Sequence, residues 1–206
     1  MINKKSLSHM SLRKSSAKET IHFYWDESLL SSNAALSYPD GSRYSGYFHE
    51  GVFHGSGIFI WSDGSRYEGR WENGYPHGRG TMLLSNGNRY EGEWKNGEAE
   101  GDGKETMSDG SRYSGKWEKG QKSGKGEMIY ADGNKYSGEW RDGLCHGHGV
   151  LHFSSNGSKY EGEWAENYMI GTGILTSQDG TRYRGEWKEN GFNIIEDSPK
   201  TASRKG

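Results

Sequence analysis

The chain has 206 residues, of which 33 are glycine and one is cysteine, and its formal net charge is −2 at pH 7. This balance argues against nucleic acid as the main ligand, and no apolar run approaches the ~20 residues of a membrane-spanning helix. Cys145 has no second cysteine to pair with, which fits a reducing, cytoplasmic setting.

Residues 1–20 are rich in serine and basic side chains, and we expect them to form a disordered tail. Such a tail is either simply solvated or makes electrostatic contact with an anionic membrane or a filament. Residues 21–43 read as a degenerate repeat that caps the N-terminal end. Ile21 and Trp25 stand 23 residues before Tyr44 and Phe48, and terminal repeats are typically irregular.

One short phrase then returns along residues 44–192, in its clearest form as Tyr90-Glu91-Gly92-Glu93-Trp94. The tyrosines that open its copies stand at positions 44, 67, 90, 113, 136, 160 and 183, so the period is 23 residues with one step of 24. A fixed period of this size indicates a repeat architecture, here six full repeats and a partial seventh. Residues 193–206 form a short basic C-terminal tail.

Each repeat alternates with period two, as a β-strand requires, so Tyr90, Gly92 and Trp94 share one face. We expect a loop from Gly97 to Gly101, a second strand, and a tight turn at the Asp-Gly or Asn-Gly pair that ends each copy. The predicted fold is all-β: an elongated, single, twisted or rolled antiparallel sheet of tandem β-hairpins, built like a solenoid.

The glycine between the tyrosine and the tryptophan of each copy leaves room for aromatic rings over the backbone. A column of Tyr and Trp rings is therefore the expected source of stability. The second strands add a variable apolar stripe, and we expect specificity for a partner to lie in these strands and their loops. Members of that stripe include Trp61, Leu84, Tyr130 and Phe153.

No catalytic motif is convincing, so we predict neither an enzyme nor a cofactor. His54, His77 and His146 share one slot of the repeat, but strand spacing separates them by about 10 Å, too far for one zinc ion. We therefore predict no metal site. A basic residue precedes each tyrosine, and this column is either a solvated, salt-bridged face or a strip that binds anions or lipid headgroups. The candidate members are Arg66, Arg89, Arg112, Lys135 and Lys159.

The pattern Tyr-x-Gly-x-Trp-x-x-Gly-x-x-x-Gly-x-Gly, closed by Asp-Gly and repeated every 23 residues, resembles the MORN (membrane occupation and recognition nexus) family. The resemblance covers residues 44–191 and, weakly, 21–43. It implies stacked hairpins with an aromatic-lined groove that accepts a helical or extended segment of a partner protein. On this basis the candidate partner-binding residues are Tyr67, Trp71, Tyr90, Trp94, Tyr113, Trp117, Tyr136, Trp140, Tyr160 and Trp164.

Three functions follow as hypotheses. The first is a non-enzymatic scaffold or adaptor that binds a partner protein, in a cytoskeletal, ciliary, flagellar or axonemal assembly, as the resemblance implies. The second is a peripheral membrane or phosphoinositide-binding module that acts through the basic column and the tails. The third, a regulatory subunit of an enzyme, has the same sequence features as the first.

Overall fold

The computed structural model describes residues 31–188 and 191–198, and every element within them is a β-strand. The predicted N-terminal tail, the first part of the predicted cap and most of the C-terminal tail lie outside these residues. The fifteen strands are β1 (Ser31–Ser37), β2 (Arg43–His49), β3 (Val52–Ile60), β4 (Arg66–Glu72), β5 (Tyr75–Leu83), β6 (Arg89–Lys95), β7 (Glu98–Thr106), β8 (Arg112–Glu118), β9 (Gln121–Ile129), β10 (Lys135–Arg141), β11 (Leu144–His152), β12 (Lys159–Ala165), β13 (Tyr168–Thr176), β14 (Arg182–Lys188) and β15 (Gly191–Ser198).

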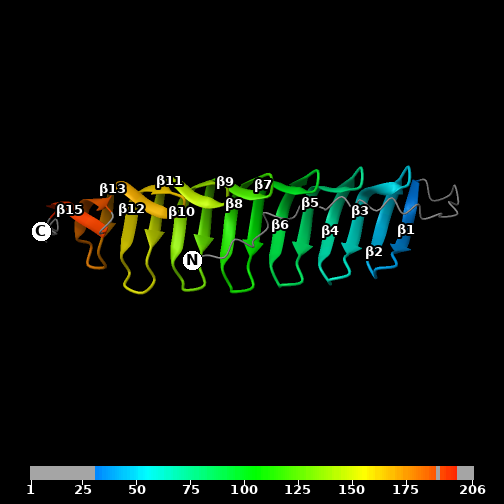
Figure 1. Cartoon of the computed structure of the whole chain (residues 1–206), viewed down its shortest axis with the longest axis horizontal. Coiled ribbons are helices and arrows are strands. Elements are labelled where there is room, and N and C mark those ends of the chain that lie inside the picture. Colours follow the sequence, from blue (N-terminus) through cyan, green and yellow to red (C-terminus); the bar gives the residue numbers. More distant parts are fainter. Residues whose placement is uncertain (1–30, 189–190, 199–206) are drawn as a thin grey trace, which may run out of the picture. The chain divides into compact units, whose positions relative to one another are not determined.

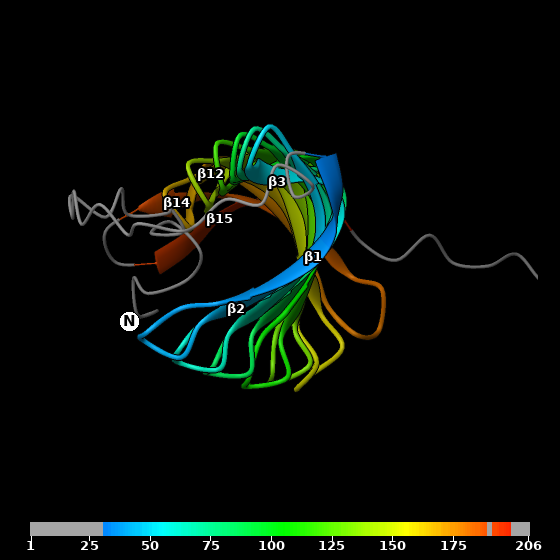
Figure 2. The ribbon, with the colours of Figure 1, turned by 90° about the vertical axis from the view of Figure 1, so that its right-hand side faces the viewer.

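The strands lie in the sheet in the order in which they occur in the chain, and the colours of Figure 1 show this order from blue to red. β1 runs antiparallel beside β2, for example (Figure 2). The described chain divides into a first compact unit, residues 31–108 with 117–121, and a second, residues 109–116 with 122–188 and 191–198. The predicted all-β fold of tandem antiparallel hairpins is confirmed.

A second tight turn lies where the sequence predicts a loop. β6 ends at Lys95 and β7 begins at Glu98, so only Asn96 and Gly97 connect them. Both have positive φ, 51° and 86°, as a type I′ turn requires. The predicted loop from Gly97 to Gly101 is therefore wrong, because the second strand starts at once. It absorbs its extra residues in a β-bulge, where the register shifts opposite Gly92 and Glu93.

The Asp-Gly and Asn-Gly pairs also lie in turns, as predicted, within longer connections that couple neighbouring repeats. The NH of Gly87 donates to the carbonyl of Leu84 at 2.9 Å, and Gly87 has a φ of 89°. Between β5 and β6 the backbone NH of Leu84 donates to the carbonyl of Asn88 at 2.8 Å, and Asn86 Oδ1 accepts from the NH of Asn88 at 2.9 Å. The Asn88 side chain then accepts a hydrogen bond from the NH of Ser108, in the next repeat, at 3.0 Å. Side chains at this position thus provide hydrogen-bond partners for backbone NH groups that have none within the turn.

Aromatic rings build the core on one side of the sheet. The Tyr90 ring lies over the backbone of Gly92 and Gly103, which face each other across β6 and β7, and its hydroxyl donates to the carbonyl of Glu93 at 2.9 Å. Trp94 stands edge-on between the rings of Tyr67 and Tyr90, with centroids 5.2 and 5.1 Å away. The two glycines are therefore needed because the ring occupies the space of their side chains.

Because these tyrosines are buried, we expect the stability of the fold to fall at alkaline pH. Burial raises the pKa of Tyr44 to about 12, and it raises the pKa values of Tyr67, Tyr90 and Tyr136 above the ordinary 10.0. The unfolded chain therefore loses these protons first, so their contribution is fully present below about pH 10 and is lost as pH rises through the folded-state pKa values. We expect a melting temperature that holds from neutral pH to about pH 10 and then falls steeply.

Circular dichroism melts at a series of pH values, read beside tyrosinate absorbance, check this expectation. Tyrosinate is expected to appear together with unfolding. Full ionisation near pH 10 in a chain that stays folded would contradict the burial of these hydroxyls.

Candidate partner-binding face

The ten Tyr and Trp residues predicted to bind a partner all lie on one side of the sheet, which we call the aromatic face. Their exposed fractions lie between 0% and 6%, so these rings form the core and offer a partner little more than their edges. They are Tyr67, Trp71, Tyr90, Trp94, Tyr113, Trp117, Tyr136, Trp140, Tyr160 and Trp164. Their contact with a partner stays a prediction.

The repeat brings these rings together in a regular way. From Trp94 to Trp187, the tryptophan of each repeat phrase packs edge-on against the tyrosine of the preceding repeat. The centroid distances lie between 4.9 and 5.9 Å. In the first unit, for example, Trp117 contacts Tyr90 at 4.9 Å, and in the second unit Trp140 contacts Tyr113 at 5.1 Å. Such edge-to-face pairs add to the free energy gained from burial alone.

A second set of side chains on the aromatic face remains partly accessible. In six of the repeats the residue directly after the second strand is large, apolar and half-buried, and we call this set the terminal stripe. Ring contact between Phe59 and Trp61 at 4.7 Å, and the 3.8 Å contact of Tyr130 Oη with Cys145 Sγ, place the stripe beside the core. Its members are Tyr38, Trp61, Leu84 and Met107 in the first unit, and Tyr130 and Phe153 in the second.

Four members of this stripe, Trp61, Leu84, Tyr130 and Phe153, belong to the variable apolar stripe predicted from the sequence, but none is among the predicted site residues. The available signal was their position: each stands two residues beyond an inward-facing residue of the second strand, and just before a turn. Tyr38 and Met107 were missed, because their second strands carry weak apolar patterns, Ser31–Ser37 and Glu98–Thr106.

Burial keeps two titratable groups near the stripe of the second unit, Cys145 and Tyr130, in their neutral forms. Burial raises the pKa of the Cys145 thiol to about 11, so the nucleophilic thiolate is scarce at neutral pH. Burial likewise raises the pKa of Tyr130. The Lys122 ammonium lies 5.2 Å from the centre of the Tyr113 ring and 5.9 Å from that of Trp140, within range of a cation–π interaction.

The opposite, polar face carries the predicted basic column, and most of it is ion-paired. The ammonium or guanidinium nitrogens lie 2.7 Å from a carboxylate oxygen for Arg66 and Glu68, and 3.7 Å for Lys159 and Glu161. Arg89 pairs with Glu91 in the same way. These pairs show the salt-bridged face that was one of the two interpretations.

The two remaining members of the column differ because serine replaces the glutamate two residues along. Lys135 uses Glu127 of the neighbouring strand instead, at 2.9 Å. Arg112 is followed by Ser114, and it forms no ion pair within the described residues. Anion or lipid binding by the five basic residues stays a prediction.

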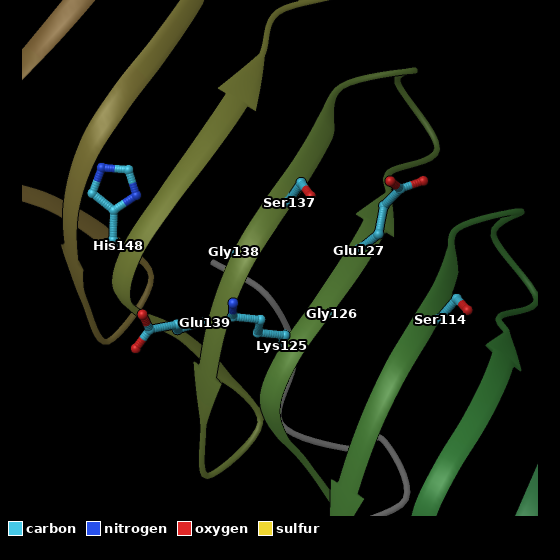
Figure 3. A pocket seen from close by; sticks show the side chains of 8 residues that line it. All are labelled: Ser114, Lys125, Gly126, Glu127, Ser137, Gly138, Glu139 and His148. Carbon is cyan, nitrogen blue, oxygen red and sulfur yellow. The ribbon is translucent and has the colours of Figure 1, made fainter.

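A shallow depression on the polar face of the second unit lies over the backbone of neighbouring strands, between polar side chains (Figure 3). Gly126 and Gly138 form its floor, and the charged groups around it have opposite signs, Lys125 against Glu127 and Glu139. In Figure 3 these side chains spread along the strands and do not converge on one point. The depression therefore lacks the paired donor, acceptor or nucleophile geometry that a catalytic centre needs.

Residues 31–188 and 191–198 contain neither a candidate metal cluster nor a candidate membrane-spanning helix. Within them no group of three or more His, Cys, Asp or Glu side chains is placed to hold a metal ion. The same residues contain no helix with the length and hydrophobicity to cross a membrane.

The fold and the aromatic face define a repeat protein built of β-hairpins, in which each copy packs its rings on the next. The chain belongs to the MORN repeat family: the family model matches six consecutive copies, at residues 44–66, 67–89, 90–112, 113–135, 136–158 and 160–182. The resemblance seen in the sequence is thereby confirmed, and membership indicates a repeat scaffold.

Among curated proteins, none matches the chain. Similar solved structures include the TCP domain of SAS-4 from Drosophila melanogaster in complex with a proline-rich motif of Ana2. It is 14% identical, with 80% of this chain and 89% of that chain covered and a TM-score of 0.40. The TCP10 domain of CPAP from Danio rerio is 10% identical, with 80% and 99% covered and a TM-score of 0.25. Scores this low say nothing about shared binding.

Proposed function

We propose that this chain is a non-enzymatic scaffold or adaptor that binds a segment of a partner protein along its aromatic face. The terminal stripe carries the proposal. It supplies one accessible apolar side chain in each of six repeats beside a closed core, and rows of exposed apolar groups typically mark interaction sites. The buried Tyr and Trp rings form the floor under such a segment and contribute their edges.

Charge also favours the aromatic face as the docking surface. The four stripe residues of the first unit, Tyr38, Trp61, Leu84 and Met107, are all uncharged. On the polar face, by contrast, basic residues alternate with glutamates that neutralise them. Binding to an anionic membrane, the second hypothesis, therefore has weaker support than binding to protein, since exposed ion pairs leave little net field.

Leu84→Glu tests this function, with Leu83→Glu as its matched control. The two residues are neighbours on opposite faces: Leu84 belongs to the stripe, whereas Leu83 lies on the polar face and is 41% exposed. We expect Leu84→Glu to reduce co-purification of partner proteins from the source cells by tenfold or more, because a buried, unpaired carboxylate at an apolar contact costs at least about 1.4 kcal/mol. Leu83→Glu is expected to leave co-purification unchanged.

Quantitative mass spectrometry of the captured proteins gives the readout, and circular dichroism verifies that both variants fold. If Leu84→Glu retains every partner that the unaltered chain captures, the stripe is not the docking surface. If Leu83→Glu loses them instead, the docking surface is the polar face.

The setting that we propose is a cytoskeletal assembly, with a cilium or flagellar axoneme as its specific form. The support is membership of the MORN repeat family, whose modules occur in such scaffolds. A fluorescent tag on the full chain, imaged against tubulin, distinguishes this setting from an even cytoplasmic distribution.

A further inference from the structure

We propose that the segment bound by the first unit is proline-rich, adopts the polyproline II conformation, and runs across the strands along Tyr38, Trp61, Leu84 and Met107. This inference rests on the proposed function, because it names the chemistry of the partner at the same face. Three observations support it: the spacing of the stripe, the hydrogen-bond donors at its N-terminal end, and its lack of charge.

The spacing selects among the regular conformations that a bound segment can take. Successive stripe residues are two strands apart, about 9.4–9.8 Å at the usual separation of neighbouring strands. A polyproline II helix has three residues per turn and a rise of about 3.1 Å, so it presents an equivalent side chain every ~9.3 Å. Over the three steps from Tyr38 to Met107 the mismatch stays within about 1.5 Å.

The other two conformations fit less well. In a β-strand, side chains on the same face recur every ~6.6 Å, and residues three apart point in opposite directions. An α-helix repeats its face every seven residues, about 10.5 Å, which accumulates a mismatch of roughly 2–3 Å over the same three steps. The stripe therefore matches the period of polyproline II.

The N-terminal end of the stripe supplies the aromatic rings and hydrogen-bond donors that such a segment needs. Proline has no NH, so a proline-rich backbone offers carbonyl oxygens and requires donors from its receptor. Tyr38, Phe59 and Trp61 form a partly exposed aromatic cluster, with Phe59 6.0 Å from Tyr38 and 4.7 Å from Trp61. Receptors for proline-rich segments use aromatic-lined surfaces of this kind.

Two donors in this cluster are available. The indole NH groups of Trp71 and Trp94, in the core column, donate to the carbonyls of Gly57 and Gly80 at 3.1 and 3.2 Å. Trp61 lies outside that column, and neither its indole NH nor the hydroxyl of Tyr38 makes a hydrogen bond within the described residues.

The test is fluorescence anisotropy of a labelled oligoproline of roughly twelve residues, long enough to span the four stripe residues, titrated with the full chain. A glycine–serine peptide and an alanine-rich helical peptide of the same length serve as controls. We expect saturable binding of oligoproline alone. Trp61→Leu is expected to weaken it about tenfold or more, and Trp61→Phe, which removes only the NH donor, by a smaller factor.

Tyr75→Ser is the matched control, because Tyr75 is 40% exposed on the polar face of the same unit. It is expected to leave binding unchanged, and circular dichroism verifies the fold of each variant. No saturable binding of oligoproline up to millimolar concentration, or binding that Trp61→Leu leaves unchanged, would overturn the inference.

These outcomes separate the inference from the function on which it rests. If the helical peptide binds and oligoproline does not, the choice of polyproline II is wrong and the docking face stands. If Leu84→Glu also keeps every cellular partner, both proposals fail together.

Discussion

Gly92→Val is expected to lower the melting temperature by roughly 6–12 °C. A side chain at position 92 has no room: its Cβ would lie 2.5 Å from the Tyr90 hydroxyl oxygen and 2.7 Å from both the carbonyl oxygen of Asp102 and Cα of Gly103. Overpacking a core costs about 1–3 kcal/mol, and we expect the upper end because two of these atoms are backbone. In a chain of this length each kcal/mol shifts the midpoint by about 2–4 °C.

Gly64→Ala separates this steric effect from backbone strain. Gly64 has a φ of 86°, which disfavours alanine, but nothing lies within 4 Å of an added Cβ. The substitution therefore carries only the strain of a left-handed residue, about 1–2 kcal/mol. Differential scanning calorimetry on both variants gives the comparison. If Gly92→Val melts no lower than Gly64→Ala, the ring does not lie against Gly92.

The residues that recur every 23 positions were enough to predict the strands, the faces to which their side chains point, and the family. They were not enough to place the two-residue turn, because both ends of a repeat carry a glycine preceded by a polar residue. Asn96-Gly97 forms the two-residue turn and Asn86-Gly87 the longer connection, although the two pairs are identical in sequence. The type I′ positions are further obscured by Glu50 and Lys119, which adopt positive φ although neither is a typical turn residue.

The sequence was sufficient to predict which face of the sheet carries the candidate site, but not which side chains of that face are accessible to a partner. Alternation places Tyr90 and Trp94 on one side, but solvent access depends on how the rings of neighbouring repeats cover each other, which a single repeat does not encode. Because each tryptophan covers the tyrosine of the preceding repeat, the column closes and accessibility moves to the residue after the second strand. The residue at that position differs between repeats, as Trp61, Leu84 and Met107 show, so no recurring residue type identifies it in the sequence.

Trp94→Ala is expected to cost about 3–5 kcal/mol, a fall in melting temperature of roughly 6–20 °C. Trp94 is 3% exposed, packs between two tyrosine rings, and donates its indole NH to the carbonyl of Gly80 at 3.2 Å. Trp94→Phe is expected to cost only about 1–2 kcal/mol, because it keeps a ring and loses the hydrogen bond and part of the area. Phe48 fills the equivalent slot of the first repeat with an edge-on contact to Tyr44 at 5.1 Å.

Trp61→Ala completes the comparison, because Trp61 shares the residue type and differs in its place. As a half-buried member of the terminal stripe, Trp61 retains part of its contact with water in the folded chain, so its loss is expected to cost less than half of what Trp94→Ala costs. Chemical denaturation, monitored by far-ultraviolet circular dichroism, measures the free energy of unfolding of all three variants. Equal costs for Trp61→Ala and Trp94→Ala would mean that the stripe belongs to the core, and the surface on which we place the partner would then not exist.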